Sequence, residues 1–312
     1  MSYEFQKLRE RSKSGELMNG YAGCMRYNLG THKKVRLKKA GLERSATLLH
    51  DHVAKRHAAL LSRELIKRAA QVGKGVDCRL RFMTVLEAVV EPDKESALEA
   101  VASLEYKMVK MLEPLGLWSR GVIELEMVNL DLLARISTGK DDEARKLNVL
   151  TSLLPEVEHQ GLMIPSDKAE SRVLVHCHVV VDLGEDHERS EQRLREKVAK
   201  EPDWNRTKYQ VEIKNLFENK ALSRNLSDIA AYVTKGGNEK LRFNAGFGRD
   251  LAGDLDAKIW REGMGFAKHG AETVEDERGL TIGEVRQLDN LYRCLMGRRS
   301  DNRGYLLATS GY

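Results

Sequence analysis

The sequence predicts an α+β fold in which helices pack against a mostly antiparallel β-sheet. Segments rich in β-branched and aliphatic residues, which are typical of strands, alternate with amphipathic segments of helical periodicity. Their order is strand, helix, strand, strand, helix, strand, helix, and this order suits one sheet with helices packed against it. With 312 residues and 35.3 kDa, the chain is long enough to bury the core of one large domain or two ordinary ones.

The chain opens with a basic segment, residues 1–74, which we expect to be mainly helical. This segment holds 17 Lys and Arg against 6 Asp and Glu, whereas the net charge of the whole chain is only +5. Residues 42–72 carry apolar side chains at roughly helical spacing. The densest positive charges precede them and comprise Lys33, Lys34, Arg36, Lys38 and Lys39. Because each phosphate neutralised by Lys or Arg releases counterions, a polyanion such as DNA is the expected partner. A solvated helix face is the alternative.

Residues 75–245 show the alternation of strands and helices and are expected to form the core domain. The expected strands cover residues 78–90, 121–130, 172–184 and 207–216, and the expected helices cover 93–116, 187–200 and 227–237. Residues from about 131 to 171 are polar and irregular, so we interpret them as an insertion. We expect residues 246–312 to form a C-terminal helical extension.

The segment RVLVHCHVVVDLG, residues 172–184, has the composition of a buried central strand but contains two histidines. Side chains alternate across a strand, so His176 and His178 project from one face and Cys177 from the other. Two imidazoles that converge on one point make half of a metal site. The alternative is a pair of core histidines hydrogen-bonded to backbone groups.

Two further segments bring chemistry to this pair. Glu124 and Glu126 share one face of the strand 121–130, and a buried carboxylate needs a partner. If that strand pairs with the histidine strand, one glutamate completes a two-histidine, one-carboxylate metal site. Tyr232 and Lys235 lie three residues apart and share a face of the helix 227–237. A tyrosine hydroxyl is a poor nucleophile near neutral pH because its pKa is about 10, but a divalent metal that polarises the phosphodiester makes its attack feasible.

The His-Cys-His strand followed by a helix bearing Tyr-x-x-Lys resembles the HUH endonucleases. The resemblance is closest to the single-tyrosine Rep initiators of rolling-circle replication. RFMTV, residues 81–85, is similar to the first motif of these Reps, and residues 291–307 are similar to the helix and arginine-rich ending found in many plasmid Reps. The chain departs from the family in having Val175 where a proline often precedes the pair, and in a long stretch between Glu126 and His176.

This resemblance implies a metal-dependent enzyme with an RRM-like core. His176, His178 and Glu126 would hold one divalent ion, Mg²⁺ or Mn²⁺, and Glu124 is the alternative acidic ligand. The substrate implied is single-stranded DNA at a replication origin or at the end of a mobile element.

The resemblance also implies the reaction. Tyr232 would attack the scissile phosphate and form a 5′-phosphotyrosine link, while Lys235 steadies the phosphate. The enzyme would thereby initiate rolling-circle replication of a plasmid, a phage or another mobile element. An HUH transposase or mobilisation relaxase is the alternative within the superfamily.

Other features limit the class of protein. No apolar run approaches the length of a membrane span, and the first 17 residues lack the apolar part of a secretory signal, so we expect a soluble, cytoplasmic protein. The four cysteines show no Cys-x-x-Cys spacing, which argues against a zinc knuckle or a disulfide framework. No Walker P-loop occurs, so a host helicase is the expected partner. A zinc-dependent hydrolase and a non-catalytic DNA-binding protein remain as rival classes.

Overall fold

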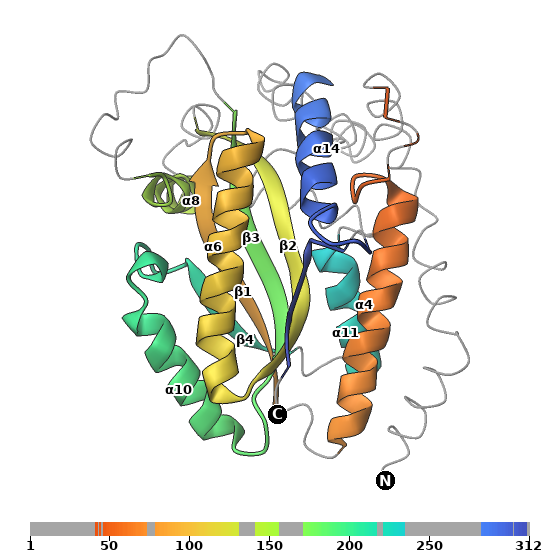
Figure 1. Ribbon diagram of the computed structural model, residues 1–312. Coiled ribbons are helices and arrows are strands. Elements are labelled where there is room, and N and C mark those ends of the chain that lie inside the picture. Colours follow the sequence, from red (N-terminus) through yellow and green to blue (C-terminus); the bar gives the residue numbers. More distant parts are fainter. Residues whose placement is uncertain are drawn as a thin grey trace, which may run out of the picture.

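The protein is an α+β molecule built on a five-stranded, antiparallel open sheet with flanking helices (Figure 1). The computed structural model describes residues 41–42, 44, 46–73, 79–130, 141–155, 171–216, 221–234, 282–301 and 303–310. The strands are β1 (Leu80–Val90), β2 (Trp118–Asn129), β3 (Ser171–Asp182), β4 (Val211–Asn215) and β5 (Leu306–Thr309). Across the sheet they lie in the order β4-β1-β3-β2-β5.

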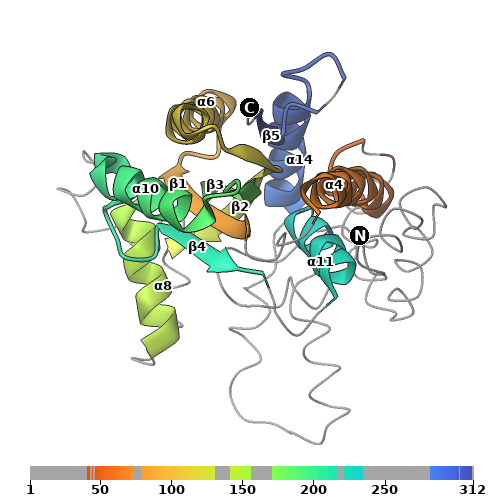
Figure 2. The ribbon, with the colours of Figure 1, turned by 90° about the horizontal axis from the view of Figure 1, so that it is seen from below.

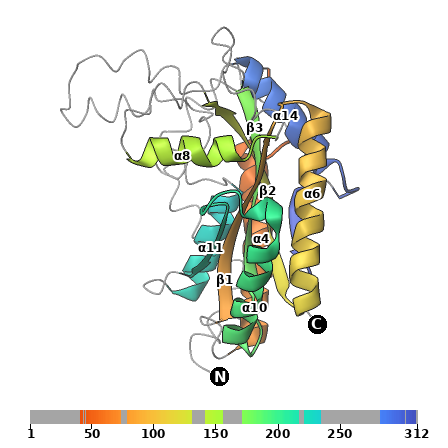
Figure 3. The same cartoon turned by 90° about the vertical axis from the view of Figure 1, so that its left-hand side faces the viewer.

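The helices flank both faces of this sheet. They are α4 (Asp51–Val72), α6 (Lys94–Leu112), α8 (Asp141–Ser152), α10 (His187–Lys200), α11 (Leu222–Val233) and α14 (Ile282–Met296), with short 3₁₀ helices η1 (Glu113–Leu115) and η2 (Pro202–Trp204). Seen with the sheet edge-on, α6 lies on one side, and α8 and α11 lie on the other (Figure 3). The view from below shows α10 beside β1, with α4 next to α11 (Figure 2). None of the described helices is long and apolar enough to cross a membrane.

The predicted strands and helices of the core are present in the predicted order, with different bounds. Helix α11 begins at Leu222 rather than at 227, and residues 235–237 of the predicted helix lie outside the described residues. The strand that carries the histidines is the central one, because β3 pairs with β1 on one side and with β2 on the other. Its valines and leucines are buried, as expected for a strand covered on both faces. Within the expected insertion the structure describes α8, and within the expected C-terminal extension it describes α14 and also β5, a strand that was not expected.

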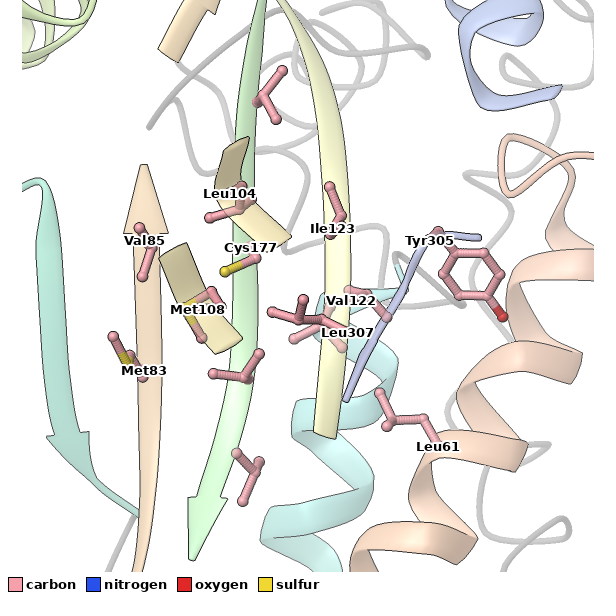
Figure 4. Packing of buried hydrophobic residues seen from close by; sticks show 14 of the residues in the cluster. Leu61, Met83, Val85, Leu104, Met108, Val122, Ile123, Cys177, Tyr305 and Leu307 are labelled. Atoms are coloured by element: carbon pink, nitrogen blue, oxygen red, sulfur yellow. The ribbon is translucent and has the colours of Figure 1, made fainter. Parts of the chain in front are cut away.

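The main hydrophobic core lies between the sheet and its helices. Side chains of β1 and β3, among them Val85 and Cys177, belong to one buried cluster with Leu104 and Met108 of α6 (Figure 4). Leu61 of α4 belongs to the same cluster. A second, smaller cluster joins α8 to the opposite face of the sheet. This second face, between α8 and α11, is where the histidines emerge.

Helix α4 is part of this core, although it lies in the basic N-terminal segment. Its Leu65 and Ile66 are buried in the main cluster, and the hydroxyl of Ser62 is 3.0 Å from that of Ser227 on α11. The apolar face predicted from helical spacing therefore packs against the sheet and α11. The basic residues proposed to bind DNA, Lys33, Lys34, Arg36, Lys38 and Lys39, lie outside the described residues.

A β-bulge in β1 adjusts the pairing beside the histidines. The register to β3 shifts between Leu86 and Ala88, so that Glu87 is the extra residue. The buried carboxylate of Glu87 accepts hydrogen bonds from Ser103, Lys107 and the indole of Trp204. These bonds hold the bulge toward α6 and leave the residues before it in register with the histidines.

Candidate metal centre

The pairing of β2 with β3 places a glutamate beside the two histidines. In the antiparallel register, Glu124 lies directly opposite His176, so the two side chains emerge on the same face. The possible ligand atoms of Glu124, His176 and His178 all lie within 4.8 Å of one another. All three residues are buried, with 2%, 4% and 5% of their surfaces exposed. The two histidines share a face, as expected, and the two strands pair, which was the condition for a glutamate to join them.

The chemistry and spacing of this triad suit a divalent ion. Imidazole nitrogen and carboxylate oxygen together make a mixed donor set that many divalent transition metals accept. Nε2 of His176 lies 3.6 Å from Oε2 of Glu124, which is longer than a hydrogen bond. Ligands bonded to one ion at about 2.1 Å are themselves about 3 to 3.5 Å apart when they occupy neighbouring positions. Glu124, His176 and His178 can therefore hold a metal ion.

Glu126, the acidic ligand favoured by the resemblance, lies at the edge of this group. Its Oε2 is also 3.6 Å from Nε2 of His176, but its side chain is 21% exposed and its register partner is Leu174. Among the described residues, the group of ligand atoms that converge contains Glu124. The structure brings both glutamates to His176, and the choice between them stays a prediction.

Tyr232 comes to the centre from α11. The ring of Tyr232 lies edge-on to the ring of His178, with the centroids 5.2 Å apart. Helix α11 is held there by its buried apolar face, which includes Leu226 and Val233, and by its packing against α4. The structure thus places the predicted nucleophile next to one predicted metal ligand. Lys235, the other predicted catalytic residue, lies outside the described residues.

Two side chains of β1 complete the surroundings of His178, and sequence reasoning assigned neither a role. The hydroxyl of Thr84 is 2.8 Å from Nδ1 of His178. The ring of Phe82 is nearly parallel to that of His178, at 11° and 5.4 Å between centroids, and it also meets Tyr232 edge-on. Both residues belong to the RFMTV segment. Strand alternation gave a signal that they share a face, but only the pairing of β1 with β3 puts that face beside His178.

Cys177, which separates the two histidines in sequence, is not available to the same ion. It points into the core on the α6 side, where burial and the charge of Glu87 raise the pKa of its thiol. A thiol that is not ionised is a poor metal ligand. Strand β2 approaches β3 closely at Gly121. A Cβ on this residue would lie 2.0 Å from the carbonyl oxygen of His178, so only glycine fits there.

Comparisons of the chain with protein-family models, with curated proteins and with solved structures found no match. The functional interpretation therefore depends on the geometry of this centre and on the sequence motifs that led to it.

Proposed function

We propose that this protein is a metal-dependent, HUH-type endonuclease that nicks and rejoins single-stranded DNA through Tyr232. In this proposal it initiates rolling-circle replication of a plasmid, a phage or another mobile element, with a host helicase as partner. The observation that carries the proposal is the position of the Tyr232 ring against His178, within a group in which Glu124 and both histidines converge. A possible nucleophile and a possible metal site meet there although they come from separate elements.

The arrangement of the sheet supports the proposal. Strands β1 and β2 are connected through α6, yet β3 lies between them, and β4 pairs with the far edge of β1. This arrangement of β-α-β-β-α-β elements is the split βαβ unit. It fits the RRM-like core that the resemblance to HUH endonucleases implies. The histidines stand on its central strand, and the proposed nucleophile follows on the helix after β4.

The proposed reaction is a transesterification at a phosphodiester. The hydroxyl of Tyr232 gives up its proton and its oxygen forms a bond to phosphorus. The bond from phosphorus to the 3′-oxygen breaks, and the departing oxygen takes up a proton as a 3′-hydroxyl, so that no proton is gained or lost overall. The product is a 5′-phosphotyrosine, whose attack by a 3′-hydroxyl reverses the step and rejoins DNA. A bound divalent ion would supply Lewis-acid polarisation of the phosphate.

The chain's own residues would bind that ion and orient the nucleophile. His176, His178 and Glu124 would hold it, and Glu126, whose Oε2 lies 3.6 Å from Nε2 of His176, would be the alternative acidic ligand. The ring contacts of Tyr232 with His178 and Phe82 would limit the orientations of its ring beside the centre. By resemblance, Lys235 would steady the phosphate. From their positive charge, the basic N-terminal residues Lys33, Lys34, Arg36, Lys38 and Lys39 would contact the DNA backbone.

A second candidate function follows from the same donor set. Two histidines and one glutamate also bind zinc in hydrolases, where a further carboxylate activates water. Glu126 would be the candidate for that base, because its carboxylate lies 3.6 Å from Nε2 of His176. In a hydrolase, however, water would be the nucleophile, so the hydroxyl of Tyr232 would have no part in the reaction. The covalent product separates the two candidates.

The test uses the full chain and a pool of randomised single-stranded oligonucleotides. With Mn²⁺ we expect some oligonucleotides to become covalently attached to the protein, and sequencing the attached DNA would reveal the preferred site. Excess chelator and the His176→Asn variant should each abolish attachment, while His187→Asn, at the start of α10, should not. Attachment that survives in chelator, or cleavage with no attached DNA, would contradict the proposal.

A further inference from the structure

We infer that Thr84 is a positioning residue that fixes the tautomer of His178 and so presents Nε2 to the metal ion. This inference rests on the proposed function, because it concerns the same centre. It assigns a role to a side chain on β1 that neither the motif nor the residue type indicates.

The first support is the geometry of the contact. In the pairing of β1 with β3, Thr84 lies directly opposite His178. Its Oγ1 is 2.8 Å from Nδ1, a distance typical of a well-formed hydrogen bond. Since threonine is branched at Cβ, its χ1 has few accessible rotamers, and a strand in the middle of the sheet holds its backbone. The hydroxyl is therefore a fixed partner rather than a mobile one.

The second support is the chemistry of a neutral imidazole. One ring nitrogen carries the proton and the other carries the lone pair that can bind a metal. If Nδ1 donates its hydrogen to Oγ1 of Thr84, Nε2 is left with its lone pair. If the hydroxyl donated instead, Nε2 would carry the proton and could not bind. Only the first direction is compatible with His178 as a ligand through Nε2.

A third observation limits rotation of the ring. Phe82 lies two residues before Thr84 on the same face of β1, and its ring stacks on His178 at 11° between planes. A 180° flip of the imidazole would break the hydrogen bond to Thr84. The flip would leave the ring in the same plane, so the stacking on Phe82 would not prevent it. The threonine thus determines which nitrogen faces Glu124 and His176, and the phenylalanine determines the plane of the ring.

The experiment compares Thr84→Val, which keeps the shape and removes the hydroxyl, with Thr84→Ser, which keeps the hydroxyl. Loss of a hydrogen bond to a metal-binding histidine typically weakens metal binding about 10-fold to 100-fold. We expect a loss of that size in Mn²⁺ affinity, measured by calorimetry, for Thr84→Val, and recovery to within about 3-fold of wild type for Thr84→Ser. Thr151→Val makes the same chemical change on α8, where the hydroxyl bonds only to backbone carbonyls, and should leave affinity unchanged.

A second readout needs no metal and separates this inference from the proposed function. In metal-free protein labelled with ¹⁵N-histidine, at a pH where imidazoles are neutral, wild-type His178 should carry its proton on Nδ1. In Thr84→Val the protonated form on Nε2 should gain population. Equal Mn²⁺ affinity of wild type and Thr84→Val, or a wild-type proton on Nε2, would overturn the role of Thr84. If wild type bound no Mn²⁺, the proposed function would fail, and the tautomer alone would decide the role of Thr84.

Discussion

Glu124 and Glu126 have the same type of side chain and lie two residues apart on one face of β2, but they differ in burial and in register partner. Glu124 is buried opposite His176, whereas Glu126 is partly exposed opposite Leu174. The resemblance to the family favoured Glu126 because family motifs are compared by position along the sequence. The choice depends on how far β2 is slid along β3, which strand composition does not reveal.

At this scale we predict that Glu124→Gln weakens Mn²⁺ binding more than Glu126→Gln. An amide keeps the shape of the side chain but loses the charge that a divalent cation prefers. We expect losses of about 100-fold for Glu124→Gln and under about 10-fold for Glu126→Gln, measured by calorimetry. The two variants serve as controls for each other. The reverse order would mean that Glu126 is the ligand, as the resemblance implies.

The strand β1 is the element that connects the core to the metal centre. Its bulge allows one strand to serve two purposes, because Glu87 turns toward α6 while Thr84 and Leu86 stay opposite His178 and His176. The sequence predicted β1 as a strand, and alternation predicted which of its residues share a face. The sequence did not predict the bulge, because its residue Glu87 is bonded to groups far away in the sequence, such as the indole of Trp204.

We predict that Glu87→Gln lowers the free energy of unfolding by about 1 to 3 kcal/mol. The amide can still accept a hydrogen bond, but Lys107 loses its buried ionic partner and keeps only Asp203, whose side chain is 46% exposed. Urea denaturation measures the change. Glu212→Gln, at an exposed ion pair with Lys214 on β4, is the matched control, for which we expect less than about 0.5 kcal/mol. Equal effects of both changes would show that the bulge does not depend on this charge.

Helix α4, near the start of the described chain, packs against the segment that leads into β5, near its end. Tyr305, just before β5, contacts His57 of α4 edge-on, with ring centroids 4.9 Å apart, and their side chains are hydrogen-bonded. Leu125 lies on β2 past the residues that pair with β5. The hydroxyl of Tyr292 on α14 accepts a hydrogen bond from the backbone N–H of Leu125 and donates one to its carbonyl oxygen. Sequence reasoning predicted a helix here but missed β5, because four residues after a long polar stretch carry too short a pattern to identify a strand.

The surroundings of His57 predict that the free energy of unfolding depends on pH. Burial, followed by the positive charges of Arg303 and Arg56, lowers the pKa of His57 from 6.5 to about 4. Between these values the unfolded chain binds a proton that the folded protein does not, so stability falls as pH falls from about 6.5 toward 4. We expect this histidine to account for about 1 to 2 kcal/mol of the loss, allowing for its partial exposure.

Urea denaturation across that pH range, with wild type and His57→Gln compared, measures this contribution. The variant should lose less stability on acidification than wild type, although it is less stable at neutral pH because its contact with Tyr305 changes. His187→Gln, which removes a histidine at the start of α10 and leaves the contact between His57 and Tyr305 intact, is the control. Parallel pH profiles for wild type and His57→Gln would show that His57 does not titrate in this window.

In the proposed reaction, Tyr232 forms a covalent bond to DNA beside the metal centre. The most direct measurement is mass spectrometry of peptides from wild-type protein that has been trapped on cleaved single-stranded DNA in the presence of Mn²⁺. We predict a nucleotide adduct on the peptide that contains Tyr232, loss of all adduct in Tyr232→Phe, and normal attachment in Tyr209→Phe, whose side chain is exposed. An adduct on another tyrosine, or cleavage by Tyr232→Phe, would contradict the claim.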